Sequence, residues 1–181
     1  MRQRGVKKVQ IFVSDDLPGL EGAIKKIFPE SDWQLCVLHM VRNTLNQVRK
    51  SDREGIAQTL KAIYRAETLS EAQEGLRKLR ETWGRKYPKV VEKWEKKAQA
   101  LLTFLKYPPE LRRYLYTTNQ LERLCKEVKR RTKVVEVFVH EGAVEKLLYL
   151  ILSGINERLG ARRLRGFAEI EVGGYRVDET H

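Results

Sequence analysis

The sequence has little cysteine and no long apolar run. Its two cysteines, Cys36 and Cys125, cannot build a framework of disulfides, which favours a reducing compartment. The longest uninterrupted apolar stretch, residues 147–152, is far too short to cross a bilayer. We expect no signal peptide ahead of the first strand. These features predict a soluble, cytoplasmic protein with no membrane partner.

Acidic residues are scarce relative to basic ones. Lys and Arg number 36 against 24 Asp and Glu, which gives a net charge of +12. This charge favours a polyanionic partner, most simply nucleic acid. The 181 residues have room for one domain, or for a small core with an appended module. Neither a glycine-rich nucleotide loop nor a plausible serine or cysteine nucleophile site occurs, so nucleotide-cofactor and acyl-transfer chemistry are not predicted.

Only two stretches are typical of β-strands. Residues 9–13 form a run rich in apolar residues, interrupted only by Gln10, and residues 33–38 form a second one, interrupted only by Gln34, after a break at Pro29. Between these two stretches, from Leu20 to Phe28, apolar residues recur at helical spacing. We therefore predict a βαβ unit with parallel strands. A sheet of two strands is marginal by itself. We therefore expect another chain, or residues of something longer, to complete it.

Two aspartates, Asp15 and Asp16, follow the first predicted strand. Ligands of parallel sheets gather at the carboxyl ends of the strands, which makes Asp15 a candidate functional residue. Either aspartate could instead merely cap the helix that begins at Leu20. This stretch alone leaves both interpretations open.

Most of the remaining sequence has helical periodicity. Ser70 and Gln73 fit a capping box for one helix, and Pro88 opens another that Pro108 and Pro109 should end. The apolar stripes of these helices predict the core of a helical bundle. The predicted helices are residues 40–50, 52–66, 70–83, 88–107 and, as a further core helix, 141–159.

The stretch from residue 114 to residue 138 combines helix-capping residues with a dense set of basic residues. Glu122 stands in one helical column with several of the bases. The helix could be a solvated one in which Glu122 pairs with Lys126, or a surface whose cations bind phosphate. We favour the second interpretation, because six basic residues exceed what one glutamate needs. The predicted DNA-binding residues here are Arg123, Lys126, Lys129, Arg130, Arg131 and Lys133.

Cys36 and His39 have the spacing of half a zinc site. Because no second pair with matching spacing occurs, the sequence does not predict zinc there. We expect both residues to pack and to position the strand end, with His39 near DNA. His140 and His181 are isolated and give no functional signal.

Three blocks of sequence together are more specific than any of these features: SDDLPGL, WQLCVLHMVRN and YTTNQLERLCKEVKRRTKVVEVF. Their order, with a helical insertion before the third, resembles that of mutator-type bacterial insertion-sequence transposases over about residues 5–167. The resemblance implies an α/β, mostly α fold: part of an RNase H-like core, with two parallel strands and covering helices, that carries an all-helical insertion. It also implies an Asp-Asp-Glu triad that holds Mg²⁺ or Mn²⁺. By position, Asp15 is similar to the second Asp and Glu122 to the Glu, so both are predicted to be catalytic and to bind metal.

The resemblance also implies partners and organisation. The partners would be DNA, as transposon ends and as target, and further copies of the chain, at the nucleoid of a prokaryote. Cys36-x-x-His39 is similar to the family's Cys/His signature, and His39 and the following Arg42 are predicted to contact DNA. The expected divisions are residues 1–50 with the catalytic Asp, 51–115 as the insertion, 116–167 with the catalytic Glu, and 168–181 as a tail without an assigned role.

One departure from the family pattern concerns the first catalytic Asp. No Asp or Glu precedes Asp15, so we expect an incomplete, truncated transposase that is inactive alone. Asp15 and Glu122 should still lie close together, because both would reach the same pair of metal ions. The alternative function is a non-catalytic basic module that binds DNA or a full-length transposase.

Overall fold

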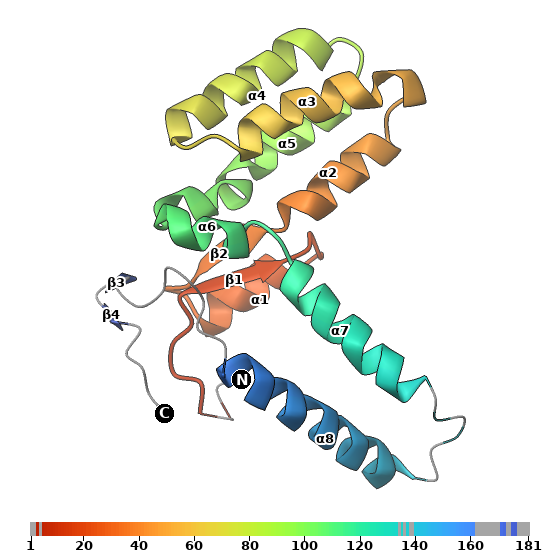
Figure 1. Cartoon of the computed structure of the whole chain (residues 1–181). Helices are drawn as coiled ribbons and strands as arrows, with labels where there is room; N and C mark the ends of the chain where they lie inside the picture. The colour runs from red at the N-terminus through yellow and green to blue at the C-terminus, as the bar shows by residue number, and fades with distance from the viewer. Residues whose placement is uncertain are drawn as a thin grey trace. The chain divides into compact units, whose positions relative to one another are not determined.

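The computed structural model describes residues 3, 5–133, 135, 137, 140–161, 171–172 and 175–176, with only the backbone given for Gln120 and after residue 161. The chain divides into two compact units, residues 1–118 and residues 119–181. Helices dominate both (Figure 1). Among the helices in the described ranges, none has both the length and the apolar character that a membrane span requires.

The first unit begins with the predicted βαβ arrangement. Strand β1 (Ile11–Ser14), helix α1 (Leu20–Ile27) and strand β2 (Asp32–Leu35) follow one another, and the two strands lie side by side (Figure 1). They pair in parallel, with Ser14 opposite Leu35. The prediction of a parallel βαβ unit is therefore confirmed. Gly19, at φ 78°, supplies the left-handed turn before α1, a backbone conformation that side chains with a β-carbon disfavour.

The second strand ends earlier than the sequence pattern predicts. Cys36 is the N-cap residue of helix α2 (Val37–Asn46), so Val37 and Leu38 form helix and not strand. The Cys36 N–H donates to the Ser14 carbonyl at 2.7 Å, and the next N–H, of Val37, donates to the Tyr116 carbonyl at 2.9 Å. A short run of buried apolar residues does not distinguish a strand from a buried helix, which explains the error.

The rest of the first unit is the predicted helical bundle. Its interior is made of fully buried side chains from several helices, among them Ile56, Leu60, Leu79 and Trp94. Trp94 donates from Nε1 to the buried Thr44 Oγ1 at 2.8 Å, which satisfies both polar groups inside the core. The bundle consists of α2, the short η2 (Lys50–Asp52), α3 (Arg53–Tyr64), α4 (Leu69–Trp83) and α5 (Pro88–Leu101).

The capping box of α4 lies two residues earlier than predicted. Thr68, not Ser70, is the N-cap residue, and its Oγ1 accepts a hydrogen bond from the Glu71 N–H at 3.2 Å. In return Glu71 Oε2 accepts from the Glu67 N–H at 2.9 Å. The sequence contains two overlapping Ser/Thr-x-x-Glu/Gln patterns, and only the earlier one begins where the chain enters the helix.

Helix α5 stops at Leu101, well before the two prolines that were predicted to end it. A 3-10 helix, η3 (Thr103–Lys106), follows, and Pro109 then begins a further helix, α6 (Pro109–Leu115). Proline suits the first turn of a helix because its missing N–H has no partner there. The prediction that the two prolines only terminate a helix was therefore wrong.

The second unit contains two helices that lie side by side, α7 (Asn119–Thr132) and α8 (Glu141–Gly160). Ile151 and Ile155 of α8 are buried, which agrees with the predicted core face of this helix. His140, to which the sequence assigned no role, caps α8 by accepting the Ala143 N–H at Nδ1 at 3.1 Å. Within the predicted tail, β3 (Glu171–Val172) and β4 (Tyr175–Arg176) pair antiparallel, and His181 lies outside the described residues.

Candidate functional site

Asp15 is the first residue after β1, at the carboxyl end of the strand. Its carbonyl accepts hydrogen bonds from the Leu17 N–H at 2.9 Å and from Ser14 Oγ at 3.1 Å, so the backbone here is held in a tight turn. Helix α1 has Gly19 at its N-cap and no side-chain cap. The alternative that Asp15 or Asp16 caps this helix is therefore wrong.

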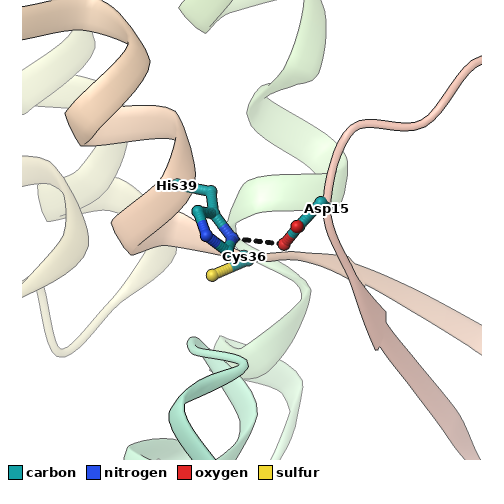
Figure 2. A group of neighbouring side chains, drawn as sticks. All are labelled: Asp15, Cys36 and His39. Atoms are coloured by element: carbon teal, nitrogen blue, oxygen red, sulfur yellow. Dashed lines mark hydrogen bonds and ion pairs between the residues drawn. The ribbon is translucent and has the colours of Figure 1, made fainter. Parts of the chain in front are cut away.

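The side chains of Asp15, Cys36 and His39 converge at the ends of the two strands (Figure 2). His39 Nδ1 is hydrogen-bonded to Asp15 Oδ1. One ligand atom from each of the three residues lies within 4.8 Å of the other two. Parallel pairing produces this cluster, because it brings the end of β1 beside the β2–α2 junction that carries Cys36 and His39.

The three side chains differ in their access to solvent. Cys36 is almost completely buried, with 3% of its surface exposed. The side chains of His39 and Asp15 are 28% and 46% exposed. The cluster thus has a buried sulfur at its base and a carboxylate that solvent and ions can reach.

Thr118 completes the surroundings of the cluster. Its backbone N–H and its hydroxyl both donate to Cys36 Sγ, each at 3.4 Å, and its Oγ1 lies 3.5 Å from His39 Nδ1. Thr118 is the last residue of the first unit and directly precedes α7. Thr118 is one of the helix-capping residues in the stretch from residue 114 to residue 138, and no local pattern reveals its contact with a cysteine 82 residues away.

Asp16 has a different environment from its neighbour. Its carboxylate forms ion pairs with Lys97 at 3.0 Å and with Lys93 at 3.5 Å, both on α5. Desolvation alone would raise the pKa of Asp16, but the hydrogen bonds and charges of these two lysines outweigh it and hold the pKa below its usual range. Of the two aspartates, Asp16 therefore joins the loop to the bundle, and Asp15 is the one in the cluster.

Glu122 and five of the predicted DNA-binding residues of the third block lie on α7, and the sixth, Lys133, directly follows its last residue; all belong to the second unit. Among the described residues, Lys126, Lys129 and Lys133 are exposed and form no ion pair. Because Glu122 belongs to the second unit and Asp15 to the first, their predicted proximity stays a prediction. So does the DNA contact of His39 and of the exposed Arg42 on α2.

Two of the predicted DNA-binding arginines have an acidic partner within the same unit. Glu127 pairs with Arg130 at 3.0 Å and with Arg131 at 3.1 Å, and Arg158 of α8 lies 3.8 Å away. The hydrogen bond from Arg130 is the main reason that the pKa of Glu127 is lowered. The spacing of three and four residues from Glu127 to these arginines is visible in the sequence, although we predicted no ion pair for Glu127.

Comparison with known proteins gives this geometry a family context. The family model described as "Transposase, Mutator family" matches residues 1–160. The chain is 35% identical over 169 residues to the transposase for insertion sequence element IS905 of Lactococcus lactis subsp. lactis (strain IL1403), which covers 93% of this chain and 43% of the relative. It is 33% identical over 159 residues to the transposase for ISRM3 of Rhizobium meliloti (strain 1021), which covers 87% of this chain and 40% of the relative.

A further relative is a probable transposase for an insertion sequence element of Corynebacterium diphtheriae. The identity is 33% over 177 residues, which is 97% of this chain and 52% of the relative. The chain thus spans between about two fifths and about half of the length of these relatives.

Proposed function

The chain belongs to the Mutator family of transposases, and we propose that it supplies Asp15 and Glu122 to a metal-dependent site that cuts and joins DNA. The site would lie on an RNase H-like core, of which β1, α1 and β2 are a part. The observation that carries the proposal is the position of Asp15. Its carboxylate is half exposed at the end of β1, caps no helix and is not tied to the lysines that hold Asp16.

The residues fit a hard divalent cation only in part. Mg²⁺ and Mn²⁺ take carboxylate oxygens, which Asp15 and Glu122 have, whereas the sulfur of Cys36 is a poor ligand for Mg²⁺. Bound metal ions of this kind stabilise the attacking and leaving oxygens of a phosphodiester. Two carboxylates hold Mg²⁺ weakly, and no Asp or Glu occurs among residues 1–14. We therefore propose that these 181 residues by themselves neither cleave nor join DNA.

Helix α7 would contact the DNA backbone. Lys126 and Lys129 are exposed on one face of the helix, at helical spacing from Glu122, and the exposed Lys133, which follows the last helical residue, continues this spacing. Cations around a carboxylate would hold phosphates next to the proposed metal ligand. A non-catalytic basic module that binds DNA is the second candidate function, and the exposed Lys126 and Lys129 of α7 favour it.

A chimera tests the catalytic proposal. Residues 1–160 of this chain would replace the matching segment of the Lactococcus lactis transposase, and joining would be measured with Mg²⁺ or Mn²⁺ on DNA that carries the ends of that element. We expect joining by the chimera, its loss in Asp15→Asn and Glu122→Gln, and its retention in Asp16→Asn. Joining that survives both Asp15→Asn and Glu122→Gln would refute the site, and joining by residues 1–181 alone would refute the proposed dependence on further residues.

A further inference from the structure

We propose that Asp15, Cys36 and His39 bind a transition-metal ion of the Zn²⁺ class. This site goes beyond the proposed Mg²⁺ chemistry, because it uses a sulfur and a nitrogen that Mg²⁺ does not prefer. The sequence alone does not predict zinc, since Cys36 and His39 have no second pair with matching spacing. In the structure the third ligand is Asp15, which lies outside the Cys36-x-x-His39 motif, in the turn after β1.

The distances suit one small ion. The three ligand atoms lie within 4.8 Å of one another, and His39 Nδ1 and Asp15 Oδ1 are in direct contact. Bond lengths of about 2.0–2.3 Å in a tetrahedral zinc site place its ligand atoms roughly 3.3–3.8 Å apart. An ion between the imidazole and the carboxylate would replace the hydrogen bond that joins them, and only a small adjustment of these two partly exposed side chains is needed.

The ligand types select the ion. A thiolate, an imidazole and a carboxylate together are typical of Zn²⁺ and Co²⁺. The two hydrogen bonds that Thr118 donates to Cys36 Sγ are of the kind that support a metal-bound thiolate. Three protein ligands leave the fourth position of a tetrahedral ion to water or to another ligand.

Occupation of this site would have a consequence for the proposed function. The ion would engage Asp15, the carboxylate that we assign to Mg²⁺, so zinc-class ions and Mg²⁺ should compete for it. This consequence rests on the proposed function. Binding of the zinc-class ion does not, and it is measurable without DNA.

Titration of the whole chain with Co²⁺ tests the site. Co²⁺ takes the place of Zn²⁺ and reports a thiolate ligand through a sulfur-to-cobalt charge-transfer band, together with visible bands of a tetrahedral ion. We expect saturable binding of one Co²⁺ per chain, displaced by Zn²⁺. The charge-transfer band should vanish in Cys36→Ser, and affinity should fall at least tenfold in His39→Gln and in Asp15→Asn.

The chain offers a matched control, because its only other cysteine, Cys125, is exposed and lies on α7. The variant Cys125→Ser should keep the full spectrum. Far-ultraviolet circular dichroism of each variant without metal shows whether it has folded, and Asp15→Asn, at a half-exposed position, is the least disruptive. The inference would be overturned if the wild-type chain showed no saturable Co²⁺ spectrum. It would also be overturned if the Co²⁺ spectrum were lost in Cys125→Ser and kept in Cys36→Ser. Neither result affects joining by the chimera, so the two proposals fail separately.

Discussion

The Phe104 N–H donates a hydrogen bond of 2.7 Å to the side-chain oxygen of Gln34, a residue that is completely buried in β2. The side-chain nitrogen of Gln34 donates to the Leu101 carbonyl at 2.9 Å. One amide thus joins the sheet to the end of α5 and to η3. Thr103 adds a second link, from its hydroxyl to the Trp33 carbonyl at 3.0 Å.

Replacement of Gln34 by leucine should destabilise the first unit. Leucine leaves the Phe104 N–H and the Leu101 carbonyl buried without this partner, at a cost of about 1–3 kcal/mol for each group left unsatisfied. Urea unfolding measures the change. The control is Gln58→Leu on the exposed side of α3, which should stay within about 0.5 kcal/mol of wild type. Equal stability of the two variants would show that the Gln34 contacts contribute nothing.

Substitution of Gly75 by alanine tests the close approach of α3 and α4. A β-carbon at Gly75 would lie 2.9 Å from Ile63 Cγ1 and 3.3 Å from the Ile63 backbone, so the helices would have to separate. We expect a loss of about 1–3 kcal/mol of unfolding free energy. Gly22→Ala in α1 is the matched control, because its β-carbon would meet nothing within 4 Å and alanine favours helix. A Gly75→Ala protein as stable as Gly22→Ala would contradict the packing.

Binding of duplex DNA by α7 should be independent of sequence and sensitive to salt. Each phosphate contact contributes about 0.9 to the slope of log affinity against log salt, because bound cations release counterions. The triple variant Lys126→Gln, Lys129→Gln, Arg130→Gln should bind more weakly and with a flatter slope, measured by fluorescence anisotropy. A second triple variant with the same change in net charge, Lys61→Gln, Arg85→Gln, Lys89→Gln on the bundle, should keep the wild-type slope. Similar losses in both would indicate a diffuse charge effect and no site on α7.

The pairing of Glu95 with Arg80 predicts how stability depends on pH. The hydrogen bond from Arg80 lowers the pKa of Glu95, and the pair joins α5 to α4. A depressed pKa stabilises the fold above the usual glutamate value of about 4.3, and this contribution disappears as the pH falls through the lower value of the folded state. Thermal unfolding of Glu95→Gln should therefore be less sensitive to acid than that of wild type. Because the pair is partly exposed, we expect an effect of about 0.2–1 kcal/mol. Glu92→Gln, exposed on the same helix, should behave like wild type.

The sequence by itself determined the order and type of most elements. Hydrophobic periodicity predicted the βαβ unit and the bundle helices, because the spacing of apolar residues reflects the local geometry of each element. The resemblance of the three blocks to one family was also visible without a structure, and the family model confirms it. The position of Asp15 at the end of a strand could also be predicted from the sequence, because it follows directly from the predicted strand.

Tertiary structure decided which side chains meet. Periodicity marks the buried face of an element but does not say which other element covers it. Only the pairing of β1 with β2 brings Asp15 to His39, 24 residues along the chain. Only the packing of α5 beside the loop separates Asp16, held by Lys93 and Lys97, from its neighbour. The chemistry of the cluster therefore depends on long-range contacts, which no local sequence pattern encodes.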